Sequence, residues 1–279
     1  MLEREEYVEQ CYFFRVLRER LRQGIPMQDT LATLREEILS TTDLPKAIDF
    51  MDGELRHAGV FGTAMAKLAH YFTPFQSFVV GEAEREEGRF DLVVALEILE
   101  REANYRSEGV TPQGLFLYEF ETLCRNRLGY DRGFAAIAAD SLFDDAWREW
   151  ILTVRRQVGI VDFADLLYVR SKAYVRDRVV RGLSADPADK PVLFGEKEGK
   201  IAAANRRKNP LLLFSALHRQ LGYPAVPRPQ PPDESVRLLP LLARRVERLE
   251  ARIKLVEEEQ REGIDLRRYY ERHGKPDAP

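Results

Sequence analysis

Glu54 and His57 are the residues of this chain whose spacing could serve metal chemistry, because a Glu-x-x-His pair lies on one face of a helix. Helical bundles that hold two metal ions use such a pair on each of two helices, together with a glutamate from each of two others. Here the other three histidines have no carboxylate three residues before them. Because a metal site needs its full ligand set, we interpret His57 as a surface or helix-capping residue. A helical enzyme, or a ligand- or metal-binding protein, that uses Glu54 and His57 is kept as an alternative function.

Cys11 and Cys124 are the candidate nucleophiles. Each lies in an apolar helical stripe without a histidine nearby in sequence, which is typical of reduced cysteines packed in a core. The chain also lacks the Gly-x-Ser-x-Gly, Gly-x-x-x-x-Gly-Lys-Ser/Thr, Gly-x-Gly-x-x-Gly and His-Glu-x-x-His signatures of common hydrolases and nucleotide-binding proteins. These observations favour a protein that is not an enzyme and predict no cofactor.

Carboxylates are abundant on the predicted helices. Acid–base catalysis would need two of them to converge in a pocket with shifted pKa values, and helical spacing alone cannot show that convergence. We therefore interpret them as parts of solvated helix faces. The residues concerned are Asp49, Asp52, Glu54, Glu97, Glu100, Glu119 and Glu121.

A basic segment over residues 155–208 suggests a second alternative, a surface that contacts nucleic-acid phosphates. The net charge is -11 over residues 1–147, +6 over residues 148–208 and +2 over residues 209–279, so an excess of cations is confined mainly to the middle of the chain. Acidic residues just before this segment could pair with it, and we favour such ion pairing over nucleic-acid binding. The candidate patch comprises Arg155, Arg156, Arg170, Lys172, Arg176, Arg178, Arg206, Arg207 and Lys208.

The composition is that of a globular, helix-rich protein, with 44% hydrophobic and 32% charged residues and a formal net charge of -3. The first residues are acidic where a secretory signal would be basic and then apolar. No apolar run approaches the roughly 18 residues that a membrane span needs. We therefore expect a cytoplasmic protein without a membrane span.

Caps and prolines mark the helix starts of residues 1–182, which we predict to form a helical bundle or array. Thr73-Pro74 and Thr111-Pro112 each combine an N-cap residue with a proline in the first helical turn. The last helix of this body is expected to run without interruption over residues 162–182.

The chain changes character after this body. Over residues 183–222 we predict a small appendage, in which residues 192–194 and 200–203 form a β-hairpin around a polar turn bounded by glycines. A short helix from residue 210 follows the hairpin. Five prolines between residues 223 and 232 predict a stiff, extended linker over residues 223–234.

The C-terminal helix, predicted over residues 235–272 before a flexible tail at 273–279, carries a heptad repeat. Val246 and Ile253 take position a, and Leu242, Leu249 and Val256 take position d. β-Branched residues at a with leucine at d favour a parallel two-stranded coiled coil. The repeat ends after Val256, because the next a and d positions hold glutamine and glycine, so the apolar seam is only about three heptads long.

Charges beside the seam favour the same arrangement. Arg245 and Arg252 take position g, and Glu250 and Glu257 take the e positions that face them across a parallel pair. An antiparallel pair would instead bring like charges together, which disfavours it.

The sequence therefore predicts a mainly α-helical chain with a multi-helix bundle or array, a small β-hairpin appendage and a C-terminal coiled-coil helix. The function expected from it is that of a non-catalytic cytosolic scaffold or adaptor, which forms a homodimer through the heptad helix and binds a protein partner of unknown identity. Packing of the heptad helix on its own body is the alternative to pairing with a second copy.

Overall fold

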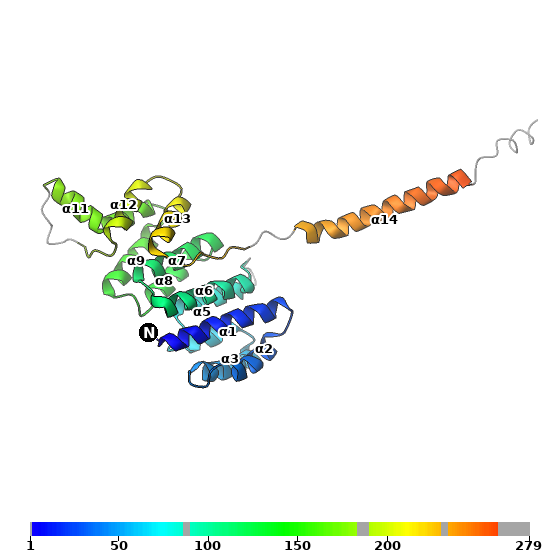
Figure 1. The fold of residues 1–279 in the computed structure, drawn as a ribbon, viewed down its shortest axis with the longest axis horizontal. Coiled ribbons are helices and arrows are strands. Elements are labelled where there is room, and N and C mark those ends of the chain that lie inside the picture. Colours follow the sequence, from blue (N-terminus) through cyan, green and yellow to red (C-terminus); the bar gives the residue numbers. More distant parts are fainter. Residues whose placement is uncertain (1, 86–89, 183–189, 230–233, 262–279) are drawn as a thin grey trace, which may run out of the picture. The chain divides into compact units, whose positions relative to one another are not determined.

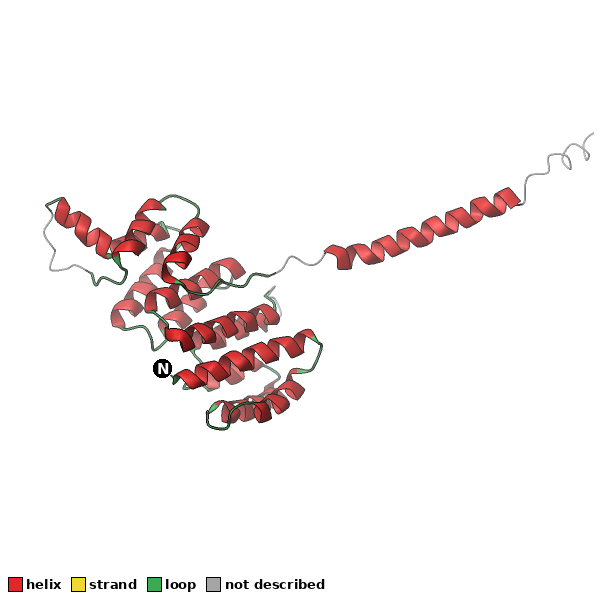
Figure 2. Cartoon of the chain, viewed as in Figure 1, coloured by secondary structure: helices red, strands yellow, loops and turns green. Residues whose placement is uncertain are grey.

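The fold is helical throughout the part of the chain that the computed structural model describes, which is residues 2–85, 90–182, 190–229 and 234–261. These residues form fourteen helices. They contain no β-sheet, and Figure 2 accordingly shows helices and loops without a strand. The predicted all-α class is confirmed. The chain divides into two compact units, Met1–Pro229 and Gln230–Pro279, and each is described by itself below.

The first six helices form pairs within the first unit. The most extensive packing is between α1 and α6, which lie side by side in Figure 1. In addition, α2 packs on α3 and α4 packs on α5. Their bounds are α1 (Arg4–Arg22), α2 (Met27–Glu37), α3 (Leu44–Ala58), α4 (Phe61–Lys67), α5 (Pro74–Ala83) and α6 (Leu92–Gly109).

Local capping explains where several helices begin. Thr73 and Gln76 form a reciprocal capping box at the start of α5, and the Thr111 hydroxyl accepts a hydrogen bond from the Gly114 N–H at the start of α7. Each cap satisfies a backbone N–H that has no partner inside the helix. Both of these helices therefore begin at the prolines that the sequence indicated.

Seven further helices complete the first unit around an aromatic core. The Phe116 ring on α7 contacts the Trp150 ring of α9, and the Phe120 ring contacts the Phe163 ring of α10. Both contacts are edge to face, with ring centres 4.8 Å apart. Such contacts favour a single packing arrangement of the large side chains. The bounds are α7 (Pro112–Asn126), α8 (Tyr130–Ala138), α9 (Asp145–Gln157), α10 (Phe163–Val169), α11 (Lys172–Val180), α12 (Glu196–Ala204) and α13 (Pro210–Leu221).

The continuous helix predicted over residues 162–182 is wrong, because the chain breaks between α10 and α11. The Arg170 carbonyl accepts hydrogen bonds from the N–H groups of Leu193 and Phe194, at 2.8 and 3.0 Å, instead of continuing the helix. The Ser171 hydroxyl then caps α11 by accepting from the Tyr174 N–H. Hydrogen bonds between residues distant in sequence therefore override the local helical pattern.

The predicted β-hairpin is also wrong. Its second arm, residues 200–203, lies within α12, and its first arm makes only an isolated bridge, between Phe194 and Ser171. The alanine-rich run after Lys200 favours a helix. Gly199 lies inside that helix rather than in a turn. Close packing requires glycine there, because an added Cβ would overlap the Ser171 hydroxyl and lie 2.8 Å from the Ala173 Cβ.

The proline-rich segment lies extended on the first unit up to Pro229. The Arg101 guanidinium donates to the Ala225 carbonyl at 2.5 Å, the Asn126 amide donates to the Pro227 carbonyl at 3.2 Å, and Tyr223 is buried. These contacts fix residues 223–229 to the body. Residues 230–233, in the C-terminal part of the predicted linker, lie outside the described residues.

The second unit contains α14 (Glu234–Arg261), a helix of 28 residues and therefore about 42 Å long. The predicted continuation to residue 272 and the predicted tail over 273–279 lie outside the described residues. Among the helices that the structure describes, none has the length and apolar character required to span a membrane.

Candidate functional site

The heptad residues of α14 form an exposed apolar stripe. Leu242, Val246, Leu249 and Ile253 have 53%, 52%, 52% and 57% of their surface accessible to solvent. The backbone of Val256, the last residue of the predicted seam, continues the helix. Apolar side chains spaced along one face and left accessible are characteristic of a surface that another element covers.

The charged residues beside this stripe are exposed as well. They are Arg245, Glu250, Arg252 and Glu257, and none of them takes part in an ion pair with another described residue. Their charges are therefore available to a partner placed against the stripe.

Glu54 and His57 do not come together with further metal ligands. The Glu54 carboxylate pairs with the Lys67 ammonium group instead, and His57 is exposed. Across the described residues, no group of three or more His, Cys, Asp or Glu side chains has an arrangement that could hold a metal ion. The geometry gives no support to the metal-binding alternative.

Part of the predicted basic patch is engaged in local ion pairs. Arg155 pairs with Asp131 at 3.1 Å, and Arg176 pairs with both Glu196 and Asp177. Each of these arginines meets a carboxylate from within the same unit, which lowers the potential that a phosphate backbone would experience.

Two other arginines of the patch serve the packing of the α10–α12 region. Arg170 is buried and donates to the Pro191 carbonyl at 3.2 Å. Arg206 pairs with Asp165 at 2.6 Å and lies over the Tyr168 ring, 4.1 Å from its centre. The remaining members of the patch lie at or near the surface and are Arg156, Lys172, Arg178, Arg207 and Lys208.

A buried charge cluster lies where the sequence predicted solvated helix faces. Arg106 of α6 contacts Glu102 at 2.7 Å, Asp140 at 2.6 Å and Glu119 of α7 at 3.5 Å, and all four side chains have at most 1% of their surface exposed. The interpretation of Glu119 as a solvated residue is therefore wrong. Glu121 is buried too, where it pairs with Arg125 and accepts a hydrogen bond from the Tyr223 hydroxyl at 2.8 Å.

Protonation differs among the members of this cluster. Burial, followed by repulsion from Glu102 and Asp140, raises the pKa of Glu119 well above its ordinary value. Burial also raises the pKa of Glu102, although its contact with Arg106 opposes that shift. The carboxylates of Glu102, Asp140 and Glu119 raise the pKa of Arg106 against the effect of its burial, so this arginine stays charged. Arg106 is one cation among three carboxylates, so a proton on Glu119 reduces the excess negative charge of the cluster.

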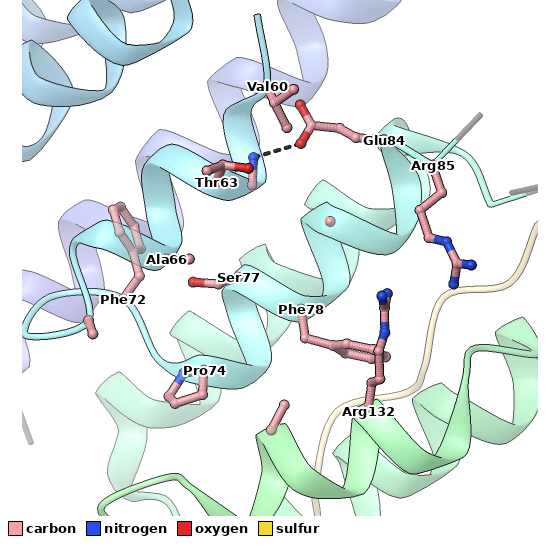
Figure 3. Close-up of a pocket in the computed structure, with 14 residues that line it drawn as sticks. Val60, Thr63, Ala66, Phe72, Pro74, Ser77, Phe78, Glu84, Arg85 and Arg132 are labelled. Carbon is pink, nitrogen blue, oxygen red and sulfur yellow. Dashed lines mark hydrogen bonds between the residues drawn. The ribbon is translucent and has the colours of Figure 1, made fainter. Parts of the chain in front are cut away.

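A groove of about 630 Å³ lies between α4, α5 and α8. Gly62, Ala66, Ser77, Gly81 and Ala136 leave the space unfilled because their side chains are small or absent. The helices α4 and α5 approach closely at one point, since a Cβ added at Gly62 would lie 2.9 Å from the Gly81 nitrogen. The rings of Phe72 and Phe78 and the Pro74 side chain form apolar walls, as Figure 3 shows.

One end of the groove is charged. Arg85, just after α5, and Arg132, on α8, extend toward each other across it in Figure 3, and both contact the carboxylate of Glu82. The Glu84 carboxylate accepts hydrogen bonds from the N–H groups of Phe61 and Gly62, both at 2.6 Å, and so caps α4. The groove thus combines an apolar trough with two guanidinium groups, an arrangement that the sequence did not indicate.

No protein-family model, curated protein or solved structure gives a significant match to this chain.

Proposed function

We propose that this chain is a non-catalytic scaffold or adaptor of the cytosol that forms a homodimer through a parallel coiled coil of α14. The observation that carries the proposal is the exposed heptad stripe on a single helix of 28 residues. A second copy supplies an identical stripe in the same register, and pairing of the two would remove both from water.

Burial of this stripe would provide a moderate driving force. Full burial of one aliphatic side chain contributes about 1.5–3 kcal/mol, and the four residues with described exposure are already about half covered by their own helix. The seam is short, and association also costs the partners their freedom of motion. We therefore expect a dimer of moderate affinity rather than a permanent one.

The charges beside the stripe support the parallel direction. In that arrangement Arg245 of one copy would face Glu250 of the other, and Arg252 would face Glu257, on both sides of the seam. Surface pairs of this kind contribute little individually, but they discriminate between alternatives, because the antiparallel alignment would set arginine near arginine. The dimer would present two copies of the helical body to a protein partner.

A measurement of molar mass against concentration tests this proposal. By light scattering, the full chain should be a dimer at high concentration, and Ile253→Asp should shift it to a monomer because a buried carboxylate would interrupt the seam. Ala251→Asp places the same charge on the same helix outside the seam, so that variant should remain a dimer. A wild-type chain that is a monomer at every accessible concentration would contradict the proposal. So would an Ile253→Asp variant that dimerises like wild type.

A further inference from the structure

We propose that the groove between α4, α5 and α8 binds a single-chain amphiphile with an anionic head, of the fatty-carboxylate type. The hydrocarbon chain would lie along the apolar trough, and the carboxylate would be held by Arg85 and Arg132. This binding activity is separate from self-association through α14 and does not depend on it.

The size and lining of the groove fit a small molecule with an apolar body. Its volume of about 630 Å³ falls in the range of about 300–1,000 Å³ that is usual for ligand sites. Phe72, Pro74 and Phe78 offer apolar contacts, whereas Thr63 and Ser77 are the only neutral polar side chains among the described residues that line it. So few hydrogen-bonding groups suit a hydrocarbon chain better than a sugar or a nucleobase.

A helix of a partner protein would find only a short wall in this groove. One wall of the groove is α4, which has 7 residues and is therefore about 10 Å long. An α-helix with its side chains is itself about 10–12 Å wide. A flexible, narrow chain makes better use of such a trough.

The exposed guanidinium groups of Arg85 and Arg132, at one end of the groove, favour a ligand with an anionic head. The Glu82 carboxylate is nearly buried and serves both Arg85 and Arg132, whose side chains remain 49% and 60% exposed. Each arginine uses a single terminal nitrogen for this contact, and a guanidinium group has five N–H donors.

The other carboxylate at this end is already occupied. Glu84 accepts from two backbone N–H groups at the start of α4 and is held away from the arginines. Among the described residues, Arg85 and Arg132 therefore pair with the same carboxylate, that of Glu82, and a ligand anion would give them a second partner.

Calorimetry with the full chain and dodecanoate, below the concentration at which that ligand forms micelles, tests the proposal. We expect saturable binding to one site per chain. Dodecanol and dodecyltrimethylammonium carry the same hydrocarbon chain with a neutral and a cationic head, and each should bind at least about tenfold more weakly, because hydrogen bonds to charged groups are lost.

Variants locate the site. Ala66→Phe, at an exposed position in the groove, should abolish binding by filling the trough, and Arg132→Gln should weaken it about tenfold or more. The matched controls are Ala32→Phe, on the exposed surface of α2, and Arg148→Gln, on α9, which should both bind dodecanoate like wild type. Light scattering of each variant should give the wild-type mass, which separates this site from α14.

Several outcomes would overturn the proposal. These are absence of dodecanoate binding by wild type, equal or tighter binding of dodecyltrimethylammonium, unchanged binding by Ala66→Phe, or binding only to anionic lipid vesicles and not to the free carboxylate. The last outcome would assign the arginines to a membrane surface instead.

Discussion

The Oε1 atom of Glu119 lies 3.5 Å from Nη2 of Arg106, yet neither oxygen of the Glu119 carboxylate accepts a hydrogen bond from the described residues. Arg106 directs its short contacts to Glu102 and Asp140. Burial of an ionised carboxylate without hydrogen bonds is costly, and a proton on Glu119 avoids that cost. The cluster is therefore a site where the folded state keeps a proton at pH values at which the unfolded state has already released it.

The stability of the protein should fall as the pH rises because of this proton. The pKa of Glu119 is raised in the folded state, so the folded chain binds more protons than the unfolded chain at every pH between the unfolded value, about 4.3, and the folded value. The contribution is therefore present below the unfolded pKa and is lost as the pH rises through the folded pKa. Each unit of upward shift corresponds to about 1.4 kcal/mol.

Glu119→Gln isolates this effect, since glutamine has the shape of the protonated acid but no proton to lose. We expect the free energy of unfolding, measured by denaturant titration across this pH range, to depend less on pH in Glu119→Gln than in wild type. Glu102, whose pKa is also raised, would leave a smaller slope of the same sign. Identical pH profiles for the two proteins would show that Glu119 is ionised in the folded state.

Removal of Arg106 should be among the most destabilising single changes in the chain. Arg106→Met leaves Glu102 and Asp140 buried without their cation, and breaking a buried ion pair in this way costs about 3–5 kcal/mol. The exposed Arg148, which pairs with Asp145 at the surface, provides the control, and Arg148→Met should change the stability by less than about 0.5 kcal/mol. The measurement is chemical unfolding at neutral pH.

Acidification separates charge from packing in Arg106→Met. The deficit relative to wild type should shrink at low pH, because protonation of the carboxylates removes the uncompensated charge. A deficit that stays constant with pH would assign the loss to packing alone.

Much of the fold could be predicted from short-range signals in the sequence. The starts of α5, α7 and α9 depend on Thr73, Thr111 and Asp144, whose side chains bond backbone groups within three residues. The break at Arg170 depends instead on contacts of the α10–α11 junction with Leu193 and Phe194, and the packing of Ser171 on Gly199 adds to the local helical preference of the run after Lys200. Such contacts arise only once the chain has folded.

The sequence around Glu119 does contain one indication that this residue is buried. Residues 115–118 and 120 around Glu119 are apolar on every face of α7, and a helix that is apolar all round is a buried helix. A glutamate inside such a helix should have been assigned to the core. The groove left no comparable signal, because its walls come from three helices that meet only in the tertiary structure.

Alanine substitutions at Gly199 and Gly53 should change the stability in opposite directions, because Gly199 is closely packed and Gly53 is not. An alanine Cβ at Gly199 would overlap the Ser171 hydroxyl, so Gly199→Ala should destabilise the protein by about 1–3 kcal/mol despite the higher helix propensity of alanine. Gly53 is inside α3, and a Cβ there would meet nothing within 4 Å. Gly53→Ala should therefore stabilise the protein by about 0.5–1 kcal/mol.

Thermal or denaturant unfolding of both glycine variants checks the prediction by the opposite signs of the two changes. If Gly199→Ala were as stable as wild type, α12 would not pack against the start of α11 as closely as the structure indicates.

A charge-reversal cycle on α14 should reveal the direction of pairing. Glu250→Arg together with Glu257→Arg would place arginine opposite arginine in a parallel dimer, and the dimer should weaken by about 0.2–1 kcal/mol for each pair. Adding Arg245→Glu and Arg252→Glu restores opposite charges across the same interface and should restore the affinity. The measurement is sedimentation equilibrium at low ionic strength, where screening is weakest.

The antiparallel arrangement predicts a different result for the same chains. There the g positions face each other and so do the e positions, so the glutamate reversals alone exchange one like-charged pair for another, and the fourfold variant changes little relative to them. A mixture of the Glu250→Arg/Glu257→Arg chain with an Arg245→Glu/Arg252→Glu chain tests pairing through α14 whichever way the helices run. Chains with four arginines at these positions should prefer chains with four glutamates over copies of themselves in either direction, so heterodimer formation reports pairing through α14. The recovery of the self-paired fourfold variant then requires the parallel alignment.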